Sequence, residues 1–200
     1  MFRFFILAVV AVATADVVHD GPCPDIKPVA NFNVTAYQGT WYEIQKYPTE
    51  AEKNGKCASA EYVLDGDTVK VTNRHVVGTV QATVTGTAKF ADDANKAGKL
   101  VVALNFGALT KEQPLLVIAT DYVNYAIAYN CKVDEKKKSQ HRENMWILSR
   151  TKKLEGEAKT AVDNFLKEHH IDTSKLVTTD FSEEACKFES TSTVSEPAKH

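Results

Sequence analysis

The sequence predicts an all-β fold, an eight-stranded antiparallel up-and-down barrel with one C-terminal α-helix packed outside it. Eight short runs rich in Val, Thr, Tyr and Ile lie between Trp41 and Arg150, and turn-forming residues separate them. After Arg150 the hydrophobic period becomes that of an amphipathic helix. Because the connections are mostly short, successive strands should be neighbours. Closing eight such strands would remove both sheet edges and leave room for one small ligand.

The predicted strands follow one another with turn residues between them. Asp65-Gly66, between the second and third runs, is a tight hairpin signal because Gly tolerates a positive φ. The limits of the eight strands are 41–48, 58–64, 68–76, 80–90, 99–106, 113–120, 125–132 and 143–150.

The predicted helix carries one apolar stripe. A single amphipathic helix cannot enter a filled barrel, so it should lie against the outer wall. The stripe consists of Ala158, Ala161, Val162, Phe165, Leu166 and His169, and the solvent-facing side carries Lys159, Asp163, Lys167 and Glu168.

The N-terminus indicates secretion. A positive start at Arg3, an apolar run and the small-x-small triplet Ala13-Thr14-Ala15 predict a signal peptide over residues 1–15. The run is too short to cross a membrane as a helix. The extracellular domain is predicted over residues 16–188, and the Ser-, Thr-, Glu- and Lys-rich residues 189–200 should form a mobile tail.

Composition excludes several partners. The chain is 44% hydrophobic and 25% charged with a net charge of −2, which predicts one soluble domain with no membrane partner. Nucleic acid binding would need a surplus of Lys and Arg, and none is present.

Four cysteines in an exported chain favour two disulfides. They are Cys23, Cys57, Cys131 and Cys186, and spacing alone leaves all three pairings open. In the same compartment, Asn33-Val34-Thr35 is a sequon for N-glycosylation.

No motif indicates an enzyme. The sequence contains no Gly-x-Ser-x-Gly, phosphate-binding loop or Cys-x-x-Cys. His169 and His170 are adjacent, so their side chains point in different directions and do not predict a metal site.

Three ordered motifs resemble the signatures of the lipocalins. They are Gly39-Thr40-Trp41-Tyr42, Thr120-Asp121-Tyr122 and Arg150. More narrowly, the chain resembles the insect bilin-binding proteins and insecticyanins, and the resemblance runs over nearly the whole mature chain. The segments that carry it are 19–24, 46–48, 55–57, 146–150, 156–162 and 180–183.

The resemblance implies a fold, a ligand and a set of roles. It implies disulfides Cys23–Cys131 and Cys57–Cys186, and biliverdin bound non-covalently and without metal, giving a blue colour. It implies that Gly39, Trp41 and Arg150 are structural, with the guanidinium across the indole at the closed end of the barrel. Thr120-Asp121 should form a turn, capped by the Asp side chain. The relatives also leave homo-oligomers open.

Strand alternation predicts which side chains face the cavity. On the third strand Val71, Asn73 and His75 share the inward face with Val69, whereas Lys70, Thr72 and Arg74 face solvent. A polar layer of Asn73, His75, Asn130 and Asn144 is expected above an apolar wall, a mixture that suits a flat ligand with N–H and C=O groups. Candidate wall residues are Val71, Val84, Leu104, Phe106 and Trp146, and candidate carboxylate contacts at the mouth are Lys132 and Arg142.

Two alternative functions stay open. The first is a carrier of another small hydrophobic ligand, such as a retinoid, an isoprenoid or a fatty acid. The second is a protein-interaction lipocalin of the protease-inhibitor type, against which the polar inward layer argues. An enzymatic lipocalin would need a free cysteine in the cavity, and two disulfides would leave none.

Overall fold

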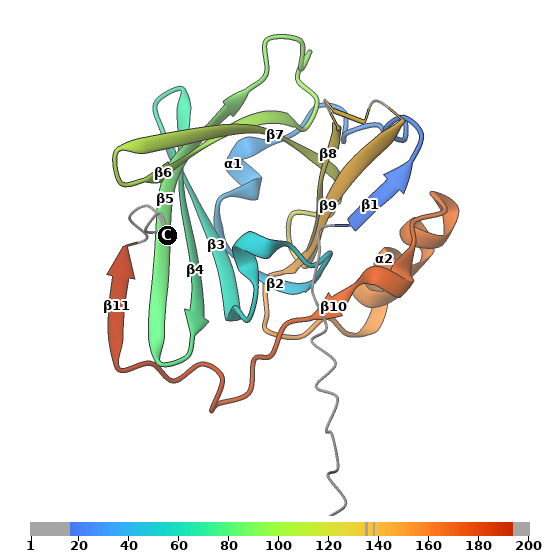
Figure 1. The fold of residues 1–200 in the computed structure, drawn as a ribbon. Coiled ribbons are helices and arrows are strands. Elements are labelled where there is room, and N and C mark those ends of the chain that lie inside the picture. The colour runs from blue at the N-terminus through green and yellow to red at the C-terminus, as the bar shows by residue number, and fades with distance from the viewer. Residues whose placement is uncertain (1–16, 135, 138, 194–200) are drawn as a thin grey trace, which may run out of the picture.

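A closed antiparallel barrel forms the body of the protein in the computed structural model, which describes residues 17–134, 136–137 and 139–193 (Figure 1). Each strand pairs with the next, and β9 pairs back with β2, which closes the barrel and confirms the predicted fold. The strands are β2 (Gly39–Lys46), β3 (Lys56–Asp65), β4 (Thr68–Val77), β5 (Val80–Phe90), β6 (Lys99–Phe106), β7 (Leu109–Thr120), β8 (Tyr125–Val133) and β9 (Gln140–Ser149).

Strand limits match the prediction where the apolar pattern is regular. β5 and β6 have the predicted limits. β7 and β9 begin earlier than predicted, at Leu109 and Gln140, because the ladders with β6 and β8 continue through polar residues that carry no strand pattern.

Three further strands add to the barrel. β1 (Val17–Asp20) pairs with β9, and β10 (Val177–Thr178) pairs with β2. β11 (Ser190–Thr193) pairs in parallel with the first residues of β5, so this part of the expected mobile tail is a strand. The β5–β6 ladder begins only at Thr85, which leaves the start of β5 open to another partner. Residues 194–200 and the predicted signal peptide lie outside the described residues.

The helix packs against the outside of the barrel, as predicted. α2 (Gly156–Glu168) buries Val162 and Leu166 against Ile127 and Ile147. The buried stripe ends at Leu166, because His169 is the C-cap residue and is exposed. Three single-turn elements complete the chain: α1 (Val34–Tyr37), η1 (Glu50–Glu52) and η2 (Thr173–Lys175).

Arg150 closes one end of the barrel. Its guanidinium carbon lies 3.6 Å from the centre of the buried Trp41 ring. Its nitrogens donate to the carbonyls of Thr40, Ala36 and Tyr122 at 3.1 to 3.2 Å. Gly39 has a φ of +93°, and a Cβ there would meet Arg150 Nη1 at 3.3 Å. The Arg150 guanidinium thus holds together the segments that contain Ala36, Thr40 and Tyr122.

Asp121 organises the neighbouring turn. Its Oδ1 accepts the backbone N–H groups of Val123, Asn124 and Tyr125 at 2.7 to 3.0 Å. Although desolvation alone would raise it, these donors hold the pKa of Asp121 below its ordinary value. Thr120 adds a bond from its hydroxyl to the Tyr125 carbonyl at 2.7 Å.

Two disulfides fasten the outer segments to the barrel. Cys23 bonds to Cys131 and Cys57 bonds to Cys186, the pairs that the resemblance implies. All four cysteines are therefore used and none is free.

Candidate ligand-binding site

The barrel encloses a cavity of about 110 Å³. The segment between β2 and β3 borders it through Glu52, and in this segment Gly55 lies so close to His75 that a Cβ would sit 3.1 Å from the ring. The apolar wall includes Val71, Val102, Leu104, Leu115, Ala128 and Leu148. The polar lining includes Glu43, Lys46, Glu52, Asn73, His75 and Gln113.

Five of the predicted ligand residues line this cavity. On β4, Asn73 and His75 face inward opposite Val84 and Ala82 of β5. Arg74, assigned to the outer face, also borders the cavity, although its guanidinium pairs with Glu61 at 3.0 Å. The five are Val71, Asn73, His75, Leu104 and Trp146.

The expected four-residue polar layer does not assemble in this cavity. Asn130 and Asn144 are directly opposite each other in the β8–β9 ladder, yet neither lines the cavity. The buried Asn130 donates its amide to the carbonyl of Pro114. The β7–β8 ladder stops at Leu116, so this carbonyl would otherwise lack a strand partner there. Asn130 therefore stabilises the barrel wall.

The remaining predicted contacts lie beyond the cavity lining. Val84 is buried, and Phe106 lies under the ammonium of Lys111, 5.6 Å from the ring centre. Lys132 and Arg142 are exposed and face each other across β8 and β9, and Arg142 forms an ion pair with Asp134 at 3.7 Å.

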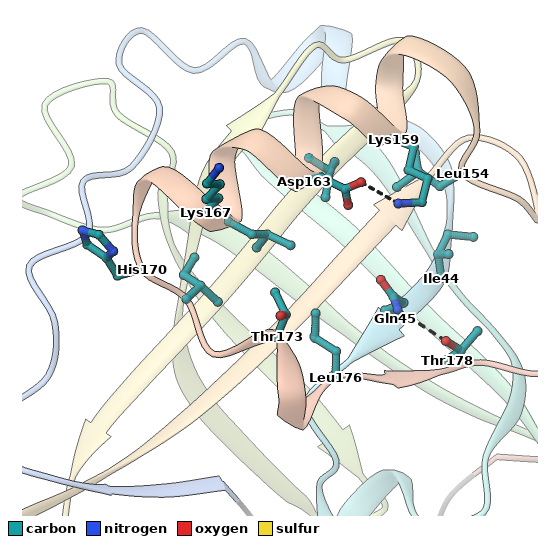
Figure 2. A pocket seen from close by; sticks show the side chains of 13 residues that line it. Ile44, Gln45, Leu154, Lys159, Asp163, Lys167, His170, Thr173, Leu176 and Thr178 are labelled. Carbon is teal, nitrogen blue, oxygen red and sulfur yellow. Dashed lines mark hydrogen bonds and ion pairs between the residues drawn. The ribbon is translucent and has the colours of Figure 1, made fainter.

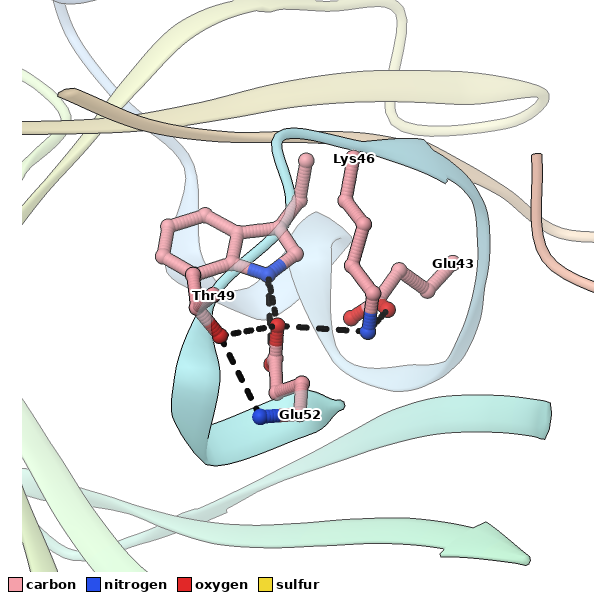
Figure 3. Close-up of polar contacts among 5 residues, drawn as sticks. Glu43, Lys46, Thr49 and Glu52 are labelled. Atoms are coloured by element: carbon pink, nitrogen blue, oxygen red, sulfur yellow. Dashed lines mark hydrogen bonds and ion pairs between the residues drawn. The ribbon is translucent and has the colours of Figure 1, made fainter. Parts of the chain in front are cut away.

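A buried charged cluster, not predicted from the sequence, borders the cavity (Figure 3). Lys46, with a side chain only 6% exposed, places its Nζ 2.6 Å from Glu43 Oε1 and 3.2 Å from Glu52 Oε2. Trp146 Nε1 donates to Glu52 Oε1 at 3.3 Å. Thr49 Oγ1 donates to Glu52 Oε2 at 3.2 Å, so Glu52 gathers three donors. We call Glu43, Lys46 and Glu52 the inner charge cluster.

Strand alternation misses this cluster because β2 is irregular. A bulge lies between Glu43 and Gln45, so Lys46 joins Glu43 on the inward face. Ile44 and Gln45, between them, line an outer groove instead. Glu52 comes from η1 rather than from a strand, so no alternation applies to it. The signal available in the sequence was the presence of charged residues, Glu43 and Lys46, on a first strand that is otherwise half-buried.

Burial shifts the ionisation of the groups around this cluster. Burial, reinforced by the charge of Glu52, raises the pKa of Glu43 to about 7 against the influence of Lys46. Although desolvation alone would lower it, the two carboxylates hold the pKa of Lys46 above its ordinary value. Burial lowers the pKa of His75, which favours the neutral imidazole at neutral pH. Burial and Glu43 together raise the pKa of Tyr62 to about 12.

An open groove of about 800 Å³ lies outside the barrel between α2 and β2 (Figure 2). Its floor is apolar, with Ile44, Leu166 and Leu176, and an ion pair between Lys159 and Asp163 at 2.5 Å lies on its rim. Within the described part of the chain, no group of three or more His, Cys, Asp or Glu side chains is placed to hold a metal, and no helix is long and apolar enough to cross a membrane.

Comparison with known proteins places this barrel in a family. The bilin-binding protein of Pieris brassicae is 50% identical over 188 residues, which cover 94% of this chain and 98% of that protein. Insecticyanin-B of Manduca sexta is 45% identical over the full length of both chains. The solved insecticyanin from the tobacco hornworm Manduca sexta superposes with a TM-score of 0.86, at 44% identity over 93% of this chain and 100% of that chain.

The family model that matches describes the same part of the molecule. It covers residues 38–183, from the start of the first barrel strand to the segment beyond α2. With the closed barrel, the external helix and the Trp41–Arg150 contact in place, the chain belongs to the lipocalin / cytosolic fatty-acid binding protein family.

Proposed function

We propose that the protein is a secreted carrier that binds a linear tetrapyrrole of the biliverdin type non-covalently inside the barrel and is blue when loaded. The observation that carries this proposal is the 50% identity to the bilin-binding protein of Pieris brassicae across nearly the whole of both chains. Secretion fits the two disulfides, which persist in oxidising compartments. Because no cysteine is free, the chain offers no thiol for covalent attachment.

The cavity lining suits a flat conjugated molecule with polar edges. The Asn73 amide and the neutral His75 imidazole can each donate and accept, so they can meet both pyrrole N–H and lactam C=O groups. Apolar residues such as Val71 and Leu104 can contact the ring faces, and the Trp146 indole adds a wide apolar surface.

The volume of the cavity requires a local movement when a tetrapyrrole binds. At about 110 Å³ it is smaller than the ~300–1,000 Å³ of ordinary small-molecule sites. The segment that carries η1 is the element that must move, because it contacts His75 and places Glu52 against Trp146. The ladders of the barrel wall can then stay intact.

Residues outside the present lining would contact the parts of the ligand near the mouth. Phe106 and Val84 extend the apolar wall on β6 and β5. Lys132 and Arg142 are exposed on the inward phase of β8 and β9, where propionate carboxylates would lie. Asn130 would reach the ligand only after its contact with Pro114 opens, and Asn144 lies directly opposite it on β9.

The test is a visible titration of the purified protein with biliverdin. Binding is expected to give long-wavelength tetrapyrrole bands and to quench the fluorescence of Trp41 and Trp146. His75→Ala should shift or weaken the bands. His169→Ala, an exposed histidine outside the barrel, should leave them unchanged. No bands and no quenching in the unaltered protein would refute pigment binding.

A smaller hydrophobic ligand is the second candidate, and the cavity volume favours it. A retinoid, an isoprenoid or a fatty acid would need less displacement of η1 than a tetrapyrrole. Saturable quenching by retinol without any response to biliverdin would support this candidate. A protein-interaction lipocalin would respond to neither.

Modification of Asn33 is a separate proposal. The residue is exposed and its side-chain oxygen caps α1 by accepting from Ala36 N at 3.0 Å. A glycan on the amide nitrogen would leave that oxygen in place. Mass spectrometry of the secreted protein before and after glycosidase treatment tests the modification.

A further inference from the structure

The inner charge cluster holds more acceptors than its own donors satisfy. Two carboxylates share one ammonium, that of Lys46. Glu43 Oε1 lies 2.6 Å from Lys46 Nζ without the alignment of a hydrogen bond, and this buried atom has no hydrogen-bond partner among the described residues. The Glu43 side chain is 13% exposed, so bulk water reaches little of it. A ligand donor would give this oxygen the aligned hydrogen bond that Lys46 does not provide.

The surrounding groups do not cancel the excess negative charge. His75 faces the cluster from β4 and is neutral at neutral pH, because burial lowers its pKa. Tyr62 faces it from β3 and keeps its proton, since its pKa is raised to about 12. Trp146, from β9, donates a neutral N–H. Among the described residues, the contacts to the two carboxylates other than Lys46 are therefore uncharged.

Both carboxylates border the same cavity as Asn73 and His75. An ionised carboxylate is an acceptor only, so Glu43 and Glu52 in their ionised forms can recognise N–H or O–H donors of a ligand. Charge-assisted hydrogen bonds of this kind are about twice as strong as neutral ones. Glu52 lies on η1, the segment whose movement would admit a large ligand, so its contacts with Trp146 and Thr49 can be exchanged for contacts to that ligand.

We propose that Glu43 and Glu52 are ligand-binding residues that accept hydrogen bonds from the N–H groups of the bound molecule, and that the cavity thereby selects conjugated ligands rich in N–H donors. This inference rests on the proposed tetrapyrrole function. The proposal also orients the ligand. The N–H edge of the ligand must face β2 and η1, while the propionate carboxylates of the ligand remain at the mouth. Lys46 acts as a positioning residue that keeps the two carboxylates together.

Isosteric variants test the role of each carboxylate. In Glu43→Gln and Glu52→Gln the side chain keeps its shape but loses the charge. The new amide NH₂ group can also face the ligand N–H, and two donors cannot form a hydrogen bond with each other. Each variant should bind biliverdin at least tenfold more weakly, the smallest effect expected from losing a charge-assisted bond. Glu112→Gln is the matched control, because Glu112 is exposed on β7 and outside the cavity lining.

Proton release gives a second readout that a structural role would not change. With the pKa of Glu43 near 7, a ligand N–H bonded to its carboxylate favours the ionised form and releases part of a proton at pH 7. Calorimetric titration with biliverdin in two buffers of different ionisation enthalpy measures this release. It should be present in the unaltered protein and in Glu112→Gln, and reduced in Glu43→Gln.

The outcomes separate the inference from the function. If the unaltered protein binds biliverdin and both variants bind it equally well with equal proton release, the inference is wrong and the carrier function stands. If the unaltered protein does not bind biliverdin, the proposed function fails and the inference falls with it. Near-ultraviolet circular dichroism verifies folding of each variant, and Glu52→Gln, a change in η1 outside the barrel strands, keeps the test decisive if Glu43→Gln misfolds.

Discussion

Glu43→Gln should make the unfolding free energy of the ligand-free protein less dependent on pH. In the folded barrel the pKa of Glu43 is about 7, against an ordinary value of 4.5. The folded state therefore holds this proton more tightly than the unfolded chain does. The resulting stability is fully present below pH 4.5 and is lost as the pH rises through 7, where folding requires a buried carboxylate.

The size of the effect follows from the shift. Each pKa unit corresponds to about 1.4 kcal/mol, so a shift from 4.5 to about 7 corresponds to about 3 kcal/mol. Gln is neutral at every pH and resembles protonated Glu43. The two proteins should differ little at pH 5, and at pH 8 the variant should gain about 3 kcal/mol relative to the unaltered protein.

Urea unfolding at pH 5, 6, 7 and 8, followed by tryptophan fluorescence with the disulfides intact, measures the difference. Glu112→Gln serves as the control and should follow the unaltered protein at every pH. A difference between Glu43→Gln and the unaltered protein that is constant from pH 5 to 8 would refute the buried-carboxyl reasoning. So would a variant that loses stability as the pH rises.

Three further changes should lower the free energy of unfolding measured in urea. Arg150→Lys keeps the charge but loses the planar fork that reaches several carbonyls, and should cost about 3 kcal/mol without altering ligand bands. Gly86→Ala would place a Cβ 2.0 Å from the backbone oxygen of Ala103 and should cost about 3 kcal/mol. Cys57→Ser combined with Cys186→Ser opens a link across 129 residues and should cost about 5 kcal/mol on the chain-entropy relation. If any of these variants lost less than ~1 kcal/mol of unfolding free energy, the structural reason given for it would be contradicted.

The fold was predictable where local pattern and long-range pairing agree. The alternation of Thr with apolar residues in β5, and the Leu- and Val-rich run of β6, indicate the limits of these strands. β10 and β11 carry no such pattern, since all their residues are exposed. They form where the closed barrel presents free backbone groups, and the Cys57–Cys186 link holds the preceding segment to the barrel. The formation of β10 and β11 therefore depends on tertiary contacts and could not be predicted from their own residues.

The same reasoning explains which site residues were found. β4 is regular around Asn73 and His75, so alternation placed both correctly on the inward face. Lys46 was missed because one bulge reverses the phase of β2. Asn130 shares the inward phase but donates to the Pro114 carbonyl, which has no partner in the β7–β8 ladder because that ladder stops at Leu116. Alternation gives the face of a residue, whereas its partners depend on neighbouring strands.

The bulge in β2 makes the polarity of the cavity depend on the path of the backbone as well as on residue type. Before it, Trp41 lies opposite Ala60, and after it Lys46 lies opposite Trp146. Plain alternation through the same residues would, with the closed end held by Trp41, place Gln45 on the inward face and turn the ammonium of Lys46 out of the barrel. The two carboxylates would then lose the counter-ion that the described residues give them. The single extra residue at the bulge thus helps to set which ligands the barrel accepts, while every cavity side chain from the other strands stays the same.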